Sequence, residues 1–418
     1  MLVARRLAIV ALGTALAAPS FAAQAPLGNV ELANVLERVL ATHPSADAAR
    51  NEVSAARSEL SGARWARFPG FSVETFADQR DGGSVSAALQ VDLPLWTGGR
   101  LGAEIRQSKS RLEATIASLD EVYLDLALRT VQSYVDLLTL RRRTAILDES
   151  LEEHRKLVDS MARRVEQEIS PASELQLARS RMRQTESEVL QARAQAEVAL
   201  LSLRELAGDE NLDVQARLNF PNSAHLPDAA ELLSAGLRFD PQWRRIAAQA
   251  EIATEDVAIR KSELLPQLGA RYVHHLGEDS DREDQLGLVV SVRTDGGLSR
   301  VSAINAARMR ERAAQRAVDS AQREQRERIM TELASYSSAR LRVLAGRDAA
   351  QAAEAVTASF LRQFAAGRRT WPEVLNAVRE AATARLAEVE AESNAVSSYL
   401  RLMLVSGHWR PAGAEESP

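Results

Sequence analysis

The sequence predicts a mainly α-helical fold that contributes β-hairpins to a membrane β-barrel. Two stretches of nearly seventy residues, 101–168 and 299–366, contain no proline and one glycine each, as expected of very long helices. Two shorter stretches, 69–95 and 267–293, show the alternating pattern of strands. The same elements recur in the same order about 200 residues apart, so the chain is predicted to be two tandem repeats.

Residues 1–22 have the pattern of a secretory signal peptide. Arg5 and Arg6 precede a short apolar run, and Ser20 and Ala22 supply the small residues of a cleavage site. A buried N-terminal helix is the alternative interpretation. No later run reaches about eighteen uninterrupted apolar residues, so we expect no transmembrane helix and entry into a membrane only as strands.

The composition excludes several classes of protein. The chain has no cysteine, which rules out disulfides, zinc–thiolate sites and a lipid anchor on an N-terminal cysteine. Aromatic residues make up only 4%, while alanine, leucine, arginine, glutamate and glutamine dominate, as in long helices. Removing Arg5 and Arg6 with the signal peptide changes the formal charge from −5 to −7, which argues against a nucleic-acid partner.

The first hairpin, 69–95, has a second arm that alternates cleanly between apolar and polar residues from position 84 onward. Because successive side chains of a strand point to opposite faces, we expect Leu89 and Val91 to face lipid and Gln90 to face the lumen. The turn is expected at Asp81-Gly82-Gly83, since glycine tolerates a positive φ. The arm is about ten residues long, enough for a tilted strand to cross a bilayer. A strand of a soluble sandwich would show the same pattern.

Each long helix is expected to reverse into a second helix, giving helical hairpins over 99–207 and 298–406. The first reversal follows residue 168, where Ser170 suits an N-cap and Pro171 the first turn of the next helix. At the second reversal Gly367 suits a C-terminal cap and Thr370 an N-cap. Apolar residues recur every three or four positions along these helices in a narrow stripe, as in a coiled-coil seam.

The two repeats are expected over 23–208 and 229–407, joined by a linker over 209–228 and followed by a polar tail over 408–418. Pro69 is matched by Pro266, 197 residues later, and Gly98 by Gly296, 198 residues later. A repeat of this length indicates a duplicated fold and excludes a short-repeat solenoid.

Four strands per chain cannot close a barrel, and open sheet edges are not tolerated in lipid. Three chains are therefore expected to share a barrel of about twelve strands. Trp65, Phe68 and Trp96 cluster at one end of the first hairpin, where an interfacial aromatic belt is expected. A core position suits Trp65 equally well.

Two motifs carry a resemblance to a known family. One is Pro94-Leu95-Trp96-Thr97-Gly98-Gly99-Arg100, and the other is the segment 364–377, FAAGRRTWPEVLNA. With the duplicated layout, they resemble the TolC-like outer-membrane factors of Gram-negative bacteria. The resemblance implies a homotrimeric channel-tunnel, with a shared 12-stranded membrane barrel and a long periplasmic α-helical barrel. It places the barrel–helix junction at Pro94, Gly98, Gly99, Pro266, Gly296 and Gly297.

The resemblance also implies a gate at the periplasmic tips of the helices. Arg369 takes the place of a tip arginine that bonds an acidic residue of the other hairpin, here Glu174 beside Ser173. An ordinary solvated tip pair is the alternative. Phe364 replaces a tyrosine, and Glu373 and Asn376 fall where relatives can carry two aspartates around the pore. The residues expected to contact an adaptor are Ile169, Ser170, Pro171, Gly367, Arg368 and Thr370.

The implied function is passive export through the outer membrane, with the helices extending into the periplasm. The tip motif and the missing lipidation cysteine are most similar to type I secretion components, which pass polypeptides from an inner-membrane ABC transporter and a periplasmic adaptor. Drug efflux driven by a proton-driven pump is the alternative, and a periplasmic coiled-coil adaptor is the alternative from another class. An enzyme is not expected, because the six histidines are dispersed and no nucleophile or phosphate-loop motif occurs. No cofactor and no metal are expected.

Overall fold

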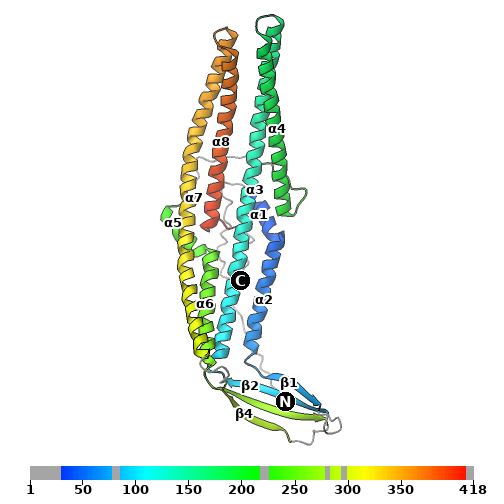
Figure 1. The fold of residues 1–418 in the computed structure, drawn as a ribbon, viewed down its shortest axis with the longest axis vertical. Helices are drawn as coiled ribbons and strands as arrows, with labels where there is room; N and C mark the ends of the chain where they lie inside the picture. Colours follow the sequence, from blue (N-terminus) through cyan, green and yellow to red (C-terminus); the bar gives the residue numbers. More distant parts are fainter. Residues whose placement is uncertain (1–29, 78–84, 217–225, 278–282, 293–298, 411–418) are drawn as a thin grey trace, which may run out of the picture.

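The computed structural model describes residues 30–77, 85–216, 226–277, 283–292 and 299–410. Four predicted features lie outside these residues: the signal peptide, the Asp81-Gly82-Gly83 turn, the Gly296-Gly297 pair and most of the polar tail. The molecule is very elongated, with a β-sheet at one end and two helical tips at the other (Figure 1).

The elements follow the predicted order in both repeats. The first repeat contains α1 (Val30–Thr42), α2 (Pro44–Trp65), β1 (Gly70–Ala77), β2 (Val85–Trp96), α3 (Arg100–Glu166) and α4 (Ala172–Ala207). The second contains α5 (Ala229–Phe239), α6 (Pro241–Ser262), β3 (Gln267–Gly277), β4 (Gln285–Ser291), α7 (Ser299–Ala365) and α8 (Trp371–Val405). The predicted fold class of two repeats, each with a β-hairpin and a long helical hairpin, is confirmed.

The longest helices, α3 and α7, each have 67 residues. At 1.5 Å per residue, each spans about 100 Å. Near the sheet they pack against α2 and α6, and toward the tips they pack against α4 and α8 (Figure 1). Because α3 contacts both α6 and α8, it joins the two repeats along the length of the molecule.

In each repeat, a proline separates the two helices that precede the β-hairpin, α1 from α2 and α5 from α6. His43 and Asp240 cap the helices that begin at Pro44 and Pro241. The Asp240 carboxylate accepts hydrogen bonds from the backbone N–H groups of Gln242 and Trp243, and the His43 ring accepts one from Ser45. Proline has no N–H to leave unpaired in a first turn, so it begins a helix here without loss.

The main core lies midway along the molecule, where α1, α3, α7 and the ends of α4 and α8 meet. Leu36, Tyr134, Leu203 and Leu400 are among its fully buried side chains. The start of the predicted linker packs here. Glu31 accepts hydrogen bonds from the Tyr134 hydroxyl and from the backbone N–H groups of residues 215 and 216, which fasten the linker to α1.

The four strands form one antiparallel sheet in the order β1-β2-β3-β4. The pairing of β2 with β3 joins the two repeats, for example Val91 opposite Tyr272. Among the described residues, β1 and β4 each pair along one edge only. Trp65 is 66% exposed at the helical side of this sheet, so it is not a core residue of the chain.

None of the described helices combines the length and apolar character needed to cross a membrane.

Candidate functional site at the helical tips

The two tips turn with the same backbone geometry. At the first tip Glu168 has a φ of 57°, and at the second Gly367 has a φ of 72°. The N–H of Ile169 donates to the carbonyl of Arg164 at 2.8 Å, and that of Arg368 to the carbonyl of Gln363 at 2.9 Å. Gly367 is the predicted C-terminal cap. Glu168 holds the equivalent left-handed position, which costs a residue with a Cβ about 1–2 kcal/mol.

An apolar cluster joins the tips of the two hairpins. Met161 and Ala178 of the first hairpin pack with Trp371, Val374 and Leu375 of the second, and all five are buried. The tips are therefore held together by apolar contact about one to two turns inside the loops. Neither sequence motifs nor residue spacing predict this cluster, because it depends on how closely the two helical hairpins approach each other.

Arg164 adds a cation–π contact between the hairpins. Its guanidinium carbon lies 4.7 Å from the centre of the Phe364 ring, and its Nε donates to the Ser170 hydroxyl at 3.4 Å. The Phe364 ring also packs 5.1 Å from Trp371. Phe364 thus lies at the contact between the hairpins although it lacks the tyrosine hydroxyl. Sequence reasoning missed Arg164. The duplication gives the one signal for it, because it makes Arg164 equivalent to Gln363, 199 residues later, beside the second tip.

Arg369 bonds within its own hairpin. Its Nη1 lies 2.7 Å from Glu373, its Nε donates to Gln363 at 3.1 Å, and its guanidinium carbon lies 4.2 Å from the centre of the Phe360 ring. The expected pair with Glu174 is not among the ion pairs of the described residues. The physical reason is local: Glu373 is four residues along the same chain, so the pair forms without bringing two hairpins together. Glu174 is half-buried beside exposed Ser173 in the first turn of α4.

Glu373 fastens the start of α8. Its Oε2 accepts the N–H and the hydroxyl of Thr370, each at 2.8 Å, as in a capping box. These bonds and Arg369 lower the pKa of Glu373 to about 2. Thr370 is the predicted N-cap. The Glu373 carboxylate is thus bonded within the first turn of its own helix. Asn376, one turn further along α8, is exposed.

The residues expected to contact an adaptor are mostly exposed. Ile169, Pro171, Gly367, Arg368 and Thr370 are exposed, and Ser170 is half-buried. One detail of the first tip was predicted incorrectly. Pro171 occupies the N-cap of α4, and the Ser170 side chain is held by Arg164 and caps no helix. The helix begins one residue later because proline fixes an extended N-cap as readily as a first turn.

At the sheet end, the junction glycines allow close packing between the repeats. Gly98 has a φ of 61°, and a Cβ added to it would lie 2.9 Å from the Cβ of Leu265. Gly99 has a φ of 89° and precedes the first residue of α3. Pro94 pairs with Gly269 beside a bulge, and Pro266 precedes β3. Glycine is required at Gly98 by both conformation and space.

Comparison with known proteins agrees with this geometry. Residues 35–209 match the family model described as outer membrane efflux protein. No curated protein matches the chain. The outer-membrane channel OprN is 20% identical, with a TM-score of 0.80 and 90% of each chain covered. The outer membrane protein VceC from Vibrio cholerae is 18% identical, with a TM-score of 0.80, covering 90% of this chain and 96% of that one. The Campylobacter jejuni CmeC outer membrane channel is 16% identical, with a TM-score of 0.78, covering 91% and 86%.

The chain therefore has a TolC-like fold, with a small β-sheet and long helices. The family is one of transport components. Within the described part of the chain, no group of three or more histidine, aspartate or glutamate side chains could hold a metal ion.

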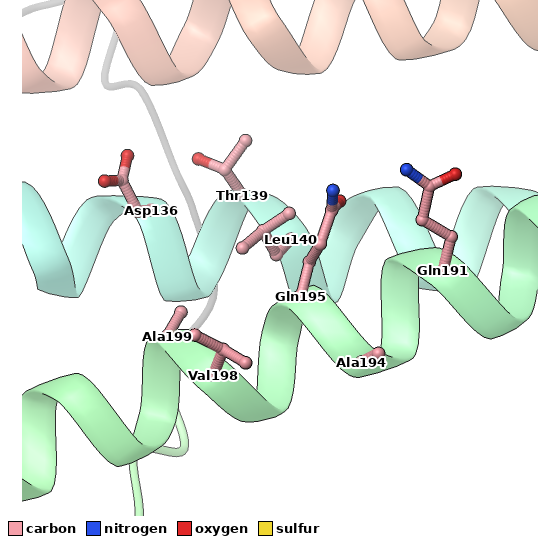
Figure 2. Close-up of a pocket in the computed structure, with 8 residues that line it drawn as sticks. All are labelled: Asp136, Thr139, Leu140, Gln191, Ala194, Gln195, Val198 and Ala199. Carbon is pink, nitrogen blue, oxygen red and sulfur yellow. The ribbon is translucent and has the colours of Figure 1, made fainter.

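A groove of about 650 Å³ opens between α3 and α4, midway along the molecule (Figure 2). The lining residues are Asp136, Thr139, Leu140, Gln191, Ala194, Gln195, Val198 and Ala199. The Thr139 hydroxyl donates to that of Ser393 on α8 at 2.7 Å, which ties one wall to the second repeat. Burial raises the pKa of Asp136, which accepts a hydrogen bond from Gln132 at 2.8 Å. Sequence reasoning missed this groove because it depends on how two helices diverge.

Proposed function

We propose that three copies of this chain form one passive export conduit through the outer membrane. The observation that carries the proposal is the sheet. It has four strands, two edges without a partner among the described residues, and one mainly apolar face. Pairing β4 of one copy with β1 of the next satisfies both edges. Three copies then close a barrel of about twelve strands, as the resemblance to trimeric channel-tunnels implies.

The two faces of the sheet differ largely as a membrane barrel requires, although His274 lies on the apolar face and bonds Asp284 at 2.6 Å toward the loop end of β3. Phe71, Val73, Leu286 and Leu288 lie on one face and are 62–79% exposed. The other face carries the Arg271–Asp92 ion pair, which joins β3 to β2 at 2.7 Å. Apolar side chains exposed to this degree fit lipid, and a charged pair fits a water-filled lumen. Leu89 and Val91 share the apolar face in this register, and Gln90 shares the polar face.

Two helices carry exposed apolar stripes that can pack against a neighbouring copy of the chain. On α4, Leu190, Val198 and Leu201 are exposed and lie on one helical face. That face borders the groove of Figure 2, which Val198 also lines. On α7, one face exposes Met309, Met330, Leu341 and Leu344. Packing α7 of one copy against α4 of the next buries both stripes and closes the periplasmic tunnel.

The tips act as the entrance in this proposal. The apolar cluster and the Arg164–Phe364 contact hold the hairpins together at the periplasmic end. An adaptor binding to the exposed loops around Ile169 and Arg368 would then favour a wider arrangement. The energy for transport comes from the inner-membrane partner.

The cargo that the sequence favours is a polypeptide, exported in type I secretion with an ABC transporter and its adaptor. This rests on the tip motif from Phe364 to Ala377 and on the absence of a cysteine for lipid attachment. Small-molecule efflux is the second candidate, favoured by the description of the matching family as efflux proteins.

Two experiments test the proposal. The full chain in detergent should have the mass of three copies and should form channels in planar bilayers; a monomer soluble without detergent would indicate a periplasmic adaptor or structural protein. For the cargo, cells lacking this chain should lose secreted polypeptides from the medium while drug susceptibility stays unchanged. The reverse result favours small-molecule efflux.

A further inference from the structure

Each repeat carries an exposed cation where its entry helix meets the sheet. Arg64 lies in the last turn of α2, and Lys261, 197 residues later, lies in the last turn of α6. Large apolar side chains follow at both places. Phe68 comes four residues after Arg64, and Leu265 comes four residues after Lys261; both are exposed. The duplication has therefore preserved a combination of charge and apolar surface at the same level of the molecule.

Several large apolar side chains are exposed at the junction of helices and sheet. Trp65 and Phe68 stack with ring centres 4.9 Å apart and a tilt of 47°. Leu95, Trp96 and Leu264 are also exposed at this level. A tryptophan ring, apolar in body with a polar N–H, favours the headgroup region of a bilayer.

The cations are available to a ligand. The ion pairs of the described residues do not include Arg64, Arg67 or Lys261, and all three side chains are exposed. The neighbouring Arg260, in contrast, is paired with Asp256 and Glu263. The junction is therefore cationic although the whole chain has a formal charge of −5.

We propose that this belt, formed by Arg64, Trp65, Arg67 and Phe68 in the first repeat and by Lys261, Leu264 and Leu265 in the second, binds anionic phospholipid headgroups. The rings and leucines insert at the boundary of the hydrocarbon, and the cations bind the phosphate groups. The proposal rests on the proposed function, because it requires the adjoining sheet to lie in a membrane. A second copy of this chain is a poorer occupant, since it would bring the same cations to the same level.

Native mass spectrometry of the full-length protein in detergent tests this, with phosphatidylglycerol or phosphatidylcholine added. The parent should retain phosphatidylglycerol preferentially. Each cation near an anionic headgroup contributes about a fivefold preference. The double variant Arg64→Gln and Lys261→Gln should therefore reduce the preference about fivefold at each of the two sites. Arg64→Lys should keep most of it.

Arg57→Gln is the matched control. Arg57 is exposed on the same helix, seven residues further from the sheet, which is about 10 Å. It should leave the lipid preference unchanged. Equal binding of both lipids by the parent, or an equal loss in the control, overturns the proposal. Weaker trimers in the double variant, with an unchanged lipid preference, would assign the belt to a neighbouring copy. Channel formation in pure phosphatidylcholine is measured separately, and its absence counts against the conduit itself.

Discussion

Replacing Arg164 with glutamine should open the periplasmic entrance. The substitution removes the cation 4.7 Å from the Phe364 ring and leaves the apolar cluster in place. Arg164 and Phe364 are half-buried, so their cation–π contact is worth at least the value of about 0.5–1 kcal/mol that exposed sites give. Three copies acting on one closed state give about 1.5–3 kcal/mol if they are independent. That changes the ratio of open to closed channels by roughly tenfold to 150-fold.

The assay is single-channel recording in planar bilayers, with the fraction of time in the high-conductance state as readout. Arg369→Ser is the informative comparison, because Arg369 bonds Glu373 and Gln363 of its own hairpin. It should open the channel less than Arg164→Gln does. Arg362→Gln removes an exposed arginine close to the same tip and should have no effect. If Arg164→Gln conducts like the parent, or if Arg369→Ser has the larger effect, the contact between the hairpins does not hold the entrance closed.

Three further predictions concern the tip loops and the sheet. Glu168→Gly should stabilise the first tip by about 1 kcal/mol, because it relieves a left-handed φ, whereas Gly367→Ala should destabilise the second; thermal unfolding measures both. Because the pKa of Glu373 is lowered to about 2, the stability that its carboxylate gives the second tip is complete above about pH 4.5 and is lost as the pH falls toward 2. A carboxyl titration by NMR should place the midpoint of Glu373 far below that of an unfolded glutamate. Leu89→Arg should impair insertion at a cost of about 2–4 kcal/mol, whereas Gln90→Arg should insert normally in a vesicle-insertion assay, and equal tolerance would show that the faces are assigned wrongly.

The overall fold could be predicted because its determinants are local and repeated. Each pattern that predicts an element involves only a few neighbouring positions: the alternation of strands, the absence of proline from helices and the residues of turns. Because the chain is duplicated, every element could also be recognised a second time. The two double glycines and the paired prolines illustrate this. Gly98 and Gly99 were identified from spacing, and both have a positive φ.

The site was less predictable because its contacts join distant parts of the chain. The Arg164–Phe364 contact spans 200 residues, and nothing in the sequence fixes how closely two helical hairpins approach. The partner of Arg369 was within reach of sequence reasoning. Thr370 and Glu373 have capping-box spacing, and Arg369 and Glu373 have the four-residue spacing of a helical ion pair. The resemblance to a family favoured a longer-range partner over this local one.

Cross-linking across the sheet edges tests the central claim most directly. Because the chain contains no cysteine, a pair can be introduced without background, one on β1 and one on β4. Val73 and Leu288 suit this test, since both are exposed on the apolar face. Within one chain β2 and β3 separate these strands by roughly 14 Å, too far for a disulfide. Oxidation of the double variant Val73→Cys and Leu288→Cys in membranes, with Phe71→Cys and Leu286→Cys to sample the register, should give covalent products that stop at three chains. Monomers only, or a ladder that continues beyond three, would contradict a closed trimeric barrel.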